Sequence, residues 1–304
     1  MKEKTRQRLL SWFQRLDRYN ALRILSDKAY IKLRFRLNFN KKLDLRNPQT
    51  YNEKLQWLKL YYRNPLYPTL VDKYLVKEYV SKQIGEKYII PTLGVWDNFD
   101  ELDFDSLPDQ FVLKCTHDSG GLVICHDKSV LDREHARAKI EKSLRVNYYW
   151  HGREWPYKQV RPRIIAEKLM MDSKDQAEEG LTDYKFFCFD GEPKAMFIAT
   201  DRAKKDIETK FDFFDMEFNH LPFTNGHPNA DKPIQKPEQF DLMVELCREL
   251  SKGHPHVRVD FYESEGHIYF GELTFFHWGG MVPFEPEEWD YTFGSWLQIP
   301  EKKG

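Results

Sequence analysis

The stretch of sequence that decides the fold reads Val257-Arg-Val-Asp-Phe-Tyr262, then Ser264-Glu-Gly266, then His267-Ile-Tyr-Phe-Gly-Glu-Leu-Thr274. Two apolar and polar alternating runs joined by a glycine-containing turn predict a β-hairpin. Because neighbouring side chains in a strand point to opposite faces, Arg258 and Asp260 should share a face with Glu272 and Thr274. The hairpin therefore predicts one sheet surface that carries two carboxylates, a guanidinium and a hydroxyl.

This polar surface allows two interpretations. Two close carboxylates repel each other unless a cation or a proton lies between them. Carboxylate oxygens suit Mg²⁺, which usually keeps water ligands and shares substrate phosphates. Asp260 and Glu272 would then hold the metal, and Arg258 would contact a phosphate. The alternative is a hairpin with a charged outer face exposed to solvent.

Three further segments carry groups that could contact a nucleotide. Lys114 ends the apolar run that begins at Phe111, and Ser119-Gly-Gly121 follows it, where glycines let backbone N–H groups approach a phosphate. Glu167 ends the run Ile164-Ile-Ala, and Lys185 opens the next apolar run. The chain has neither a G-x-x-x-x-G-K-[ST] loop nor a G-x-G-x-x-G motif. Each segment alone is equally typical of an ordinary strand and turn.

The order of elements predicts an α+β protein. Residues 5–36 have apolar positions at helical spacing and few helix breakers, and the pair Thr50 and Glu53 is typical of a helix capping box. Strand-like runs begin near residue 88 and alternate with helical segments. Helices first and mixed strands and helices afterwards indicate a fold built from α+β subdomains.

Composition excludes several classes of protein. No run of 18 uncharged apolar residues occurs, so we expect no membrane-spanning helix, and the charged start at residues 1–8 does not predict a secretory signal. The four cysteines form no C-x-x-C pair and no zinc spacing, which favours buried, reduced thiols in a cytoplasmic protein.

The first 46 residues are strongly basic, with 14 Lys and Arg against four Asp and Glu. Such a segment could contact an anionic surface such as membrane headgroups at the inner face of the membrane, or a polyanionic polysaccharide. The alternative is a solvated helix whose apolar residues pack on the body of the protein. The apolar residues that would pack on the body are Leu9, Leu10, Trp12, Phe13 and Leu16. Nucleic-acid binding is not expected, since no nucleic-acid motif accompanies the charge.

Taken in order, these segments resemble one known family. From about Leu43 onward the chain is similar to the TupA-like ATP-grasp family of bacterial surface-polysaccharide and teichuronopeptide biosynthesis. The matching phrases are Asn47-Pro-x-Thr50-Tyr-Asn-Glu-Lys54, Asp72-Lys73-Tyr, Leu107-Pro-x-x-Phe-Val-Leu-Lys114, Pro162-Arg-Ile-Ile-Ala-Glu167, Asp183-Tyr-Lys-Phe, Val257-Arg-Val-Asp-Phe-Tyr262 and Tyr269-Phe-Gly-Glu-Leu-Thr-Phe275, with Gly279-Gly280 after it.

The resemblance implies an ATP-grasp fold in which two α+β subdomains clamp ATP, preceded by a helical segment. The expected parts are a helical N-terminal segment (1–87), a lid subdomain (88–170) and a C-terminal subdomain with the magnesium-binding hairpin (171–304). Many relatives have a full α/β subdomain where this chain has helices, which leaves the place of the carboxylate substrate open.

The resemblance also implies a role for each site residue. ATP phosphates would be contacted by Lys73, Lys114 and Lys185, with Gly120 and Gly121 in a loop that closes over them. Adenine would be held by Glu167 and the backbone of Lys168 and Leu169. Asp260, Glu272 and Thr274 would bind Mg²⁺, although ATP-grasp enzymes usually carry Asn where this chain has Thr274. Arg258, with Lys185, would act in catalysis by steadying an acyl phosphate.

The implied reaction joins a carboxylate to an amine. A carboxylate would attack the γ-phosphoryl group of ATP to give an acyl phosphate, and an amine would then form an amide. The family suggests a uronic acid in a sugar or glycan as the carboxylate, and an amino acid or other amine as its partner. Two segments, 114–121 and 145–160, could close over the site. The aromatic residues of the second could stack on a sugar and Arg153 could hold its carboxylate, unless that segment is only a surface flap.

Two other functions remain open from the sequence. A glycosyltransferase of the same pathway could use an acidic pair to bind a metal, and it would usually carry a D-x-D motif. Asp103-Phe-Asp105 fits this motif but lies in an acidic stretch. A non-catalytic polysaccharide-binding protein would leave the lysines and carboxylates without a shared purpose. Five residues could line an acceptor site, but core or loop roles are the favoured alternative for each: Phe223, Asn225, His227, His277 and Trp278.

Overall fold

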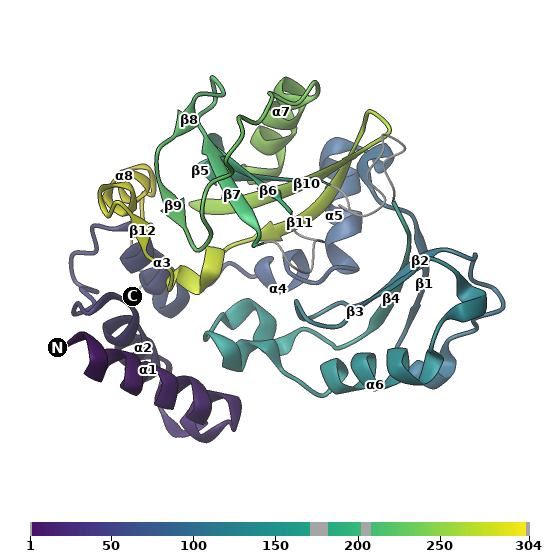
Figure 1. Ribbon diagram of the computed structural model, residues 1–304, viewed down its shortest axis with the longest axis horizontal. Helices are drawn as coiled ribbons and strands as arrows, with labels where there is room; N and C mark the ends of the chain where they lie inside the picture. Colours follow the sequence, from purple (N-terminus) through teal and green to yellow (C-terminus); the bar gives the residue numbers. More distant parts are fainter. Residues whose placement is uncertain (1, 171–181, 202–207, 302–304) are drawn as a thin grey trace.

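The computed structural model describes residues 2–170, 182–201 and 208–301. Two separate antiparallel sheets face each other across the middle of the molecule, and helices surround them (Figure 1). None of the helices in the described part of the chain is long and apolar enough to cross a bilayer. The four cysteines are buried and free, as expected.

The N-terminal part is helical. Its elements are α1 (Glu3–Arg18), η1 (Ala21–Ile24), α2 (Asp27–Phe39), α3 (Tyr51–Tyr61), α4 (Tyr67–Leu70), α5 (Leu75–Ile84) and η2 (Glu86–Tyr88). The expected single helix over 5–36 is wrong, because Asn20 takes a left-handed conformation with φ of 61° and ends the first helix. The capping box is confirmed, since the Thr50 hydroxyl accepts from the Glu53 N–H while the Glu53 carboxylate accepts from the Thr50 N–H.

The first sheet has four strands in the order β1-β4-β2-β3. They are β1 (Thr92–Trp96), β2 (Phe111–Cys115), β3 (Leu122–Cys125) and β4 (Ile164–Lys168). Helix α6 (Arg133–Leu144) covers its outer face and buries Ala136 and Ile140 there (Figure 1). Four short 3-10 helices connect these elements: η3 (Phe99–Glu101), η4 (Lys128–Val130), η5 (Tyr148–His151) and η6 (Trp155–Gln159).

The second sheet has six strands in the order β11-β10-β5-β6-β7-β8. They are β5 (Asp183–Phe189), β6 (Glu192–Thr200), β7 (Lys210–Phe214), β8 (His220–Leu221), β10 (His256–Ser264) and β11 (His267–Thr274). Both expected hairpins are confirmed, and each turns through two left-handed residues, Asp190-Gly191 and Glu265-Gly266. A two-stranded sheet pairs β9 (Thr224–Asn225) with β12 (Phe284–Glu285).

Helix α7 (Phe240–Ser251) covers one face of the six-stranded sheet (Figure 1). Its buried positions Phe240, Met243, Val244, Cys247 and Leu250 recur at helical spacing, and Phe240 packs on Phe186 of β5. The opposite face meets α3 and α8 (Glu288–Trp296) at one end and stays open toward the four-stranded sheet at the other. The polar face of the β10–β11 hairpin lies at this open end.

Candidate functional site

Strand pairing places the predicted polar residues side by side. In the β10–β11 hairpin, Asp260 pairs with Glu272 and Arg258 pairs with Thr274. On the other side of β10, Asp260 pairs with Lys185 of β5. The prediction that these side chains share one sheet surface is therefore confirmed.

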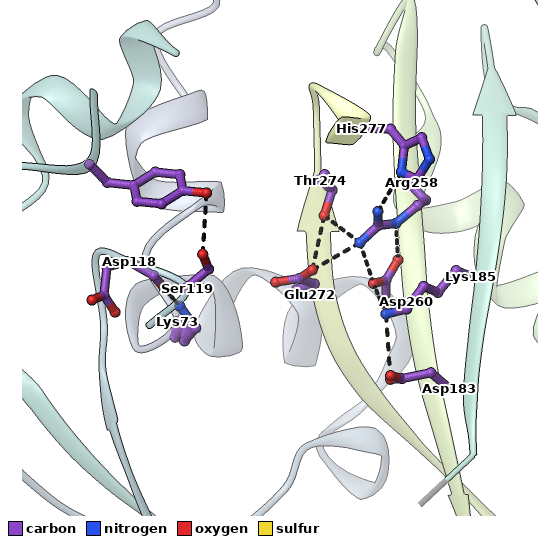
Figure 2. A network of polar contacts seen from close by, with 11 residues as sticks. Lys73, Asp118, Ser119, Asp183, Lys185, Arg258, Asp260, Glu272, Thr274 and His277 are labelled. Carbon is purple, nitrogen blue, oxygen red and sulfur yellow. Dashed lines mark hydrogen bonds and ion pairs between the residues drawn. The ribbon is translucent and has the colours of Figure 1, made fainter. Parts of the chain in front are cut away.

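A buried charge network forms the base of the site (Figure 2). Asp260 is fully buried, and its Oδ2 accepts at 2.6 Å from both Lys185 Nζ and Arg258 Nη2, while Oδ1 accepts from Arg258 Nε at 2.7 Å. Burial raises the pKa of Asp260, but the charges of Arg258 and Lys185 overcome it and lower the pKa below its ordinary value. Asp260 is therefore an ionised carboxylate that orients two cations.

Glu272 and Thr274 extend this network toward solvent. Arg258 Nη2 donates to Glu272 Oε1 and to the Thr274 hydroxyl, both at 3.0 Å, and that hydroxyl donates to Glu272 at 3.1 Å. Behind Arg258, His277 Nδ1 lies 2.8 Å from Nη1, and burial followed by the Arg258 charge lowers the pKa of His277 well below its ordinary value. A neutral His277 can accept from Arg258 and donate through Nε2 to Asn225, 3.0 Å away. Arg258 is thus held from every side.

A β-bulge at Gly271 shapes the hairpin, and the sequence analysis missed it. The register moves from Asp260 opposite Glu272 to Phe261 opposite Phe270, so Gly271 is the extra residue of β11. A Cβ on Gly271 would lie 3.0 Å from the Asp260 carbonyl oxygen and 2.9 Å from the Tyr262 ring. The sequence signal that could have predicted the bulge is Gly271 itself, because a glycine inside a strand pattern often marks a bulge.

On the facing sheet, Glu167 holds two lysines. Its carboxylate lies 2.6 Å from Lys114 Nζ and 2.5 Å from Lys77 Nζ. Burial raises the pKa of Glu167, but these two cations outweigh it and lower the pKa. Lys77 of α5 was not predicted as a site residue, because none of the matching phrases includes it. Only the pairing of Glu167 with two cations reveals it.

The glycine loop after β2 carries the third group of site residues. Lys73 contacts the Asp118 carbonyl oxygen (Figure 2). The Asp118 carboxylate accepts from the Gly121 N–H at 3.1 Å and from the Ser143 hydroxyl. Burial lowers the pKa of Lys73, while the charges of Glu272 and Asp118 oppose that change. Lys73 therefore lies between the two sheets, near Glu272 and the glycine loop.

A cavity between the two sheets brings these groups together. Of the predicted site residues, it is lined by Lys73, Lys114, Gly121, Glu167, Lys185 and Glu272. Arg258, Asp260 and Thr274 lie directly behind Glu272 and Lys185 in the network, whereas Gly120, Lys168 and Leu169 do not line the cavity. Unpredicted lining residues include Lys77, Ile89, Ile90, Asp118, Ser119, Tyr262 and Phe270. The cavity is thus lined by both cationic and apolar side chains.

The acidic residues fit a magnesium ion that is shared with phosphates. Across the described residues, no group of three or more His, Cys, Asp and Glu side chains could form a complete metal site. Mg²⁺ is usually held by only one or two carboxylates together with substrate phosphates. Glu272 lines the cavity, its Oε2 has no hydrogen bond from the described residues, and Thr274 adds a hydroxyl. Both oxygens of Asp260 are paired with Arg258 and Lys185, so Asp260 would bind the metal by exchanging one of these partners. The donor set is therefore incomplete alone and suited to a metal–nucleotide complex.

Comparison with solved structures gives distant similarities to ATP-grasp ligases. The D-alanine–D-alanine ligase from Bacillus anthracis in complex with ATP is 17% identical, with a TM-score of 0.40 over 68% of this chain and 55% of that one. The D-alanine–D-alanine ligase from Helicobacter pylori is 13% identical, with a TM-score of 0.41 over 82% and 69%. The ATP-grasp ligase PsnB with minimal precursor, Mg and ADP is 10% identical, with a TM-score of 0.38 over 73% and 57%.

The chain spans little more than half the length of the Bacillus anthracis and PsnB proteins. No curated protein sequence matches it significantly. The TupA-like ATPgrasp family model matches residues 53–298, which include every predicted site residue. The α+β chain therefore belongs to the TupA-like ATP-grasp family.

Proposed function

We propose that the protein is an ATP-dependent carboxylate–amine ligase that forms an amide through an acyl phosphate. The observation that carries this proposal is the convergence of four lysines, Glu167 and Glu272 on one cavity between two sheets. A triphosphate needs several cations around it, and the cavity supplies them from segments far apart in the sequence.

The nucleotide would lie between the sheets. Lys73, Lys114 and Lys185 would contact the phosphates, and Glu167 would keep Lys114 oriented through its 2.6 Å ion pair. Glu167 and the backbone of Lys168 and Leu169 would hold the adenine edge, with Glu167 in the cavity lining and the other two directly after it in the chain. Apolar walls for the base are available at Ile89, Ile90, Tyr262 and Phe270.

The hairpin would supply the reacting end of the site. Asp260, Glu272 and Thr274 would hold Mg²⁺, which when bound offsets negative charge on the phosphoryl group during transfer. Arg258 would steady the acyl phosphate, since Asp260 and His277 fix its guanidinium beside Glu272. This preorganisation is the kind that lowers the energy of a charged transition state.

We further propose a uronic acid of a surface polysaccharide as the carboxylate, with an amino acid or another amine as its partner. The support for this choice is the family resemblance. The predicted uronate contact through Arg153 does not fit, because Arg153 is buried, donates to the Leu22 carbonyl oxygen at 2.8 Å and stacks on Tyr30. A residue other than Arg153 would have to bind the uronate carboxylate.

The glycosyltransferase alternative finds less support. Every strand pair in the described residues is antiparallel, so that part contains no parallel Rossmann-like half for a nucleotide sugar. The Asp103 carboxylate accepts from the Asp105 N–H at 3.0 Å in an exposed turn, which is an ordinary local role.

A phosphate-release assay tests the ligase proposal. We expect wild-type protein with Mg²⁺ and ATP to release ADP and phosphate only when a uronic acid and an amine are both present. Glucuronate and galacturonate with a panel of amino acids and simple amines provide the screen. Release of UDP from UDP-sugars, with no ADP formed in any combination, would favour the glycosyltransferase instead.

We also propose that α1 contacts an anionic membrane surface from the cytoplasmic side. Leu9, Trp12 and Leu16 lie on one helix face and are 46%, 62% and 40% exposed, while only Phe13 of the helix is buried. The alternative of packing on the body is confirmed for Phe13 and Leu10 and is wrong for Leu9, Trp12 and Leu16. Apolar residues beside exposed Arg8 and Arg15 are typical of helices that lie in a lipid interface.

Vesicle sedimentation tests this contact. Vesicles of phosphatidylglycerol should retain the protein, those of phosphatidylcholine should not, and Trp12→Ser should release it while Tyr291→Ser, at an exposed ring on α8, should not. Equal sedimentation of wild type and Trp12→Ser would exclude the proposed surface.

A further inference from the structure

The segment 148–159 forms a wall beside the hairpin and is anchored to the N-terminal helices. Arg34 donates to the His151 carbonyl oxygen at 2.7 Å, and the Tyr149 hydroxyl donates to Asp27 at 2.5 Å. Trp155 stacks on Tyr67 with ring centroids 5.8 Å apart. These contacts fix the backbone on both sides of Glu154.

Lys59 ties this wall to the turn that follows β11. It is fully buried, and its Nζ donates to the carbonyl oxygens of Gly152 at 3.0 Å and Gly279 at 2.6 Å. Gly279 belongs to η7 (His277–Gly280), which begins three residues after Thr274. The wall and the metal-binding hairpin thus meet at one buried ammonium group.

Glu154 lies at this junction, and its carboxylate forms no hydrogen bond with any residue that the structure describes. A Cβ on Gly279 would lie 3.4 Å from Glu154 Oε1 and 3.5 Å from Lys59 Nζ. Among the described residues, no hydrogen bond or ion pair involves the Glu154 carboxylate, because Lys59 and Arg34 donate to backbone carbonyl oxygens instead. Burial raises the pKa of Glu154, and the charges of Lys59 and Arg34 only partly oppose this. The residue is half-buried, so a carboxylate to which no described protein group donates stays accessible to a cationic ligand.

The carboxylate also lies near the proposed reaction centre. The Ser119 hydroxyl, at the cavity edge, donates to the Tyr148 hydroxyl at 3.2 Å, and the Tyr148 ring packs on Tyr157 at 4.9 Å. After burial, the negative charges of Glu154 and Glu272 are the next causes that raise the pKa of Tyr157. Tyr157 therefore lies within the electrostatic reach of both carboxylates.

We propose that Glu154 is the binding residue for the amine substrate and accepts a proton from it. This inference rests on the proposed ligase function. The incoming ammonium group would donate to the Glu154 carboxylate and pass it one proton, leaving a neutral amine. The amine nitrogen then forms a bond to the acyl carbon, the bond from that carbon to the phosphate oxygen breaks, and the second proton leaves with inorganic phosphate.

Lys59 acts in this arrangement as a positioning residue. Its two bonds to Gly152 and Gly279 keep the turns on both sides of Glu154 in place. Because Lys59 donates to neutral carbonyl oxygens and not to Glu154, the carboxylate remains available for a cationic ligand. This separation of two nearby opposite charges is the feature that distinguishes the junction from a simple buried ion pair.

Amine binding to the nucleotide-loaded protein tests the assignment. The probes are ethanolamine, glycinamide and L-lysine, each added to protein saturated with Mg²⁺ and a non-hydrolysable ATP analogue, with thermal unfolding as the readout. At least one amine should raise the unfolding temperature of wild type, and Glu154→Gln should lose this rise. Glu245→Gln, at an exposed position of α7, is the matched control and should respond like wild type.

The outcomes separate the two proposals. If no probe stabilises the wild type, or if Glu154→Gln responds as wild type does, the amine site is overturned. If the ATP analogue itself gives no stabilisation, the ligase proposal fails together with it. In an active preparation, Glu154→Gln should still form an acyl phosphate that hydroxylamine traps, while amide formation falls at least about 100-fold, the size typical of a lost acid–base group.

Discussion

At the residue scale, the site is built from acids that each hold two cations before any nucleotide is bound. Glu167 holds Lys77 and Lys114, and Asp260 holds Arg258 and Lys185. Each carboxylate is buried and stays ionised because its cations outweigh the cost of burial. The cations therefore keep their positions without a ligand, and little reorganisation is needed when phosphates arrive.

Glu272 differs from these acids, since its side chain is 45% exposed and faces the cavity. We expect Glu272→Gln to lower ADP formation at least about 100-fold, because an amide cannot replace an anionic metal ligand. Gln can still accept from Arg258, so the free energy of unfolding should change by less than about 1 kcal/mol.

Turnover and thermal unfolding of Glu272→Gln are compared with those of the wild type. Glu134→Gln, on the exposed face of α6, is the control. Unchanged turnover in Glu272→Gln would remove Glu272 from the metal site. Loss of folding in that variant would instead give Glu272 a structural role.

Sequence reasoning reached most of these residues but missed Lys77 and the isolated position of the Glu154 carboxylate. Alternation along two strands was enough to place Asp260 and Glu272 on one surface, because the period of a strand fixes which side chains share a face. Lys77 was missed because its helix reaches the sheet only through tertiary packing, which a local pattern does not encode. Glu154 was noted only as part of an aromatic segment, since the absence of a partner is visible only in three dimensions.

At the scale of elements, the loop between β2 and β3 depends on one of its two glycines. A Cβ on Gly121 would lie 2.6 Å from Cys115 Sγ and 2.7 Å from Ser143 Oγ, whereas one on Gly120 would have its nearest neighbour at 3.9 Å. Gly121 also donates to Asp118, whose backbone contacts Lys73. The conformation of the loop therefore depends on Gly121 and not on Gly120.

We expect Gly121→Ala to destabilise the protein by about 1–3 kcal/mol through overpacking, and to weaken ATP binding by displacing the loop. Gly120→Ala should remain close to wild type in both. Chemical denaturation and titration with a fluorescent ATP analogue would measure the two effects. If both alanine variants bind the analogue equally, the loop geometry does not matter for the nucleotide.

The limits of prediction at this scale have physical causes. The strands and hairpins were predicted because their alternation and turn residues agree. The bulge at Gly271 was not, since it depends on the close approach of Asp260 in the partner strand. The N-terminal helix was predicted as continuous because Asn20 is only a weak helix breaker, and its left-handed conformation is set by the packing of α1 against α2.

At the scale of the whole molecule, the cavity exists because two sheets and a helix meet. The four-stranded sheet contributes Lys114 and Glu167, and the six-stranded sheet contributes Lys185 and Glu272. Lys73 comes from the segment that leads into α5. We propose that the expected boundaries near residues 87 and 170 separate these parts. The order of motifs along the chain predicted the family, since the spacing of site residues reflects the fold that unites them.

The central claim is that this cavity holds a magnesium–ATP complex between Lys114 on one sheet and Glu272 on the other. A crystal structure with Mg²⁺ and a non-hydrolysable ATP analogue tests it most directly. We expect phosphate oxygens within hydrogen-bonding distance of Lys73, Lys114 and Lys185, and a metal ion bound by Asp260 and Glu272. A nucleotide bound elsewhere, or a metal ion held without Glu272, would contradict it.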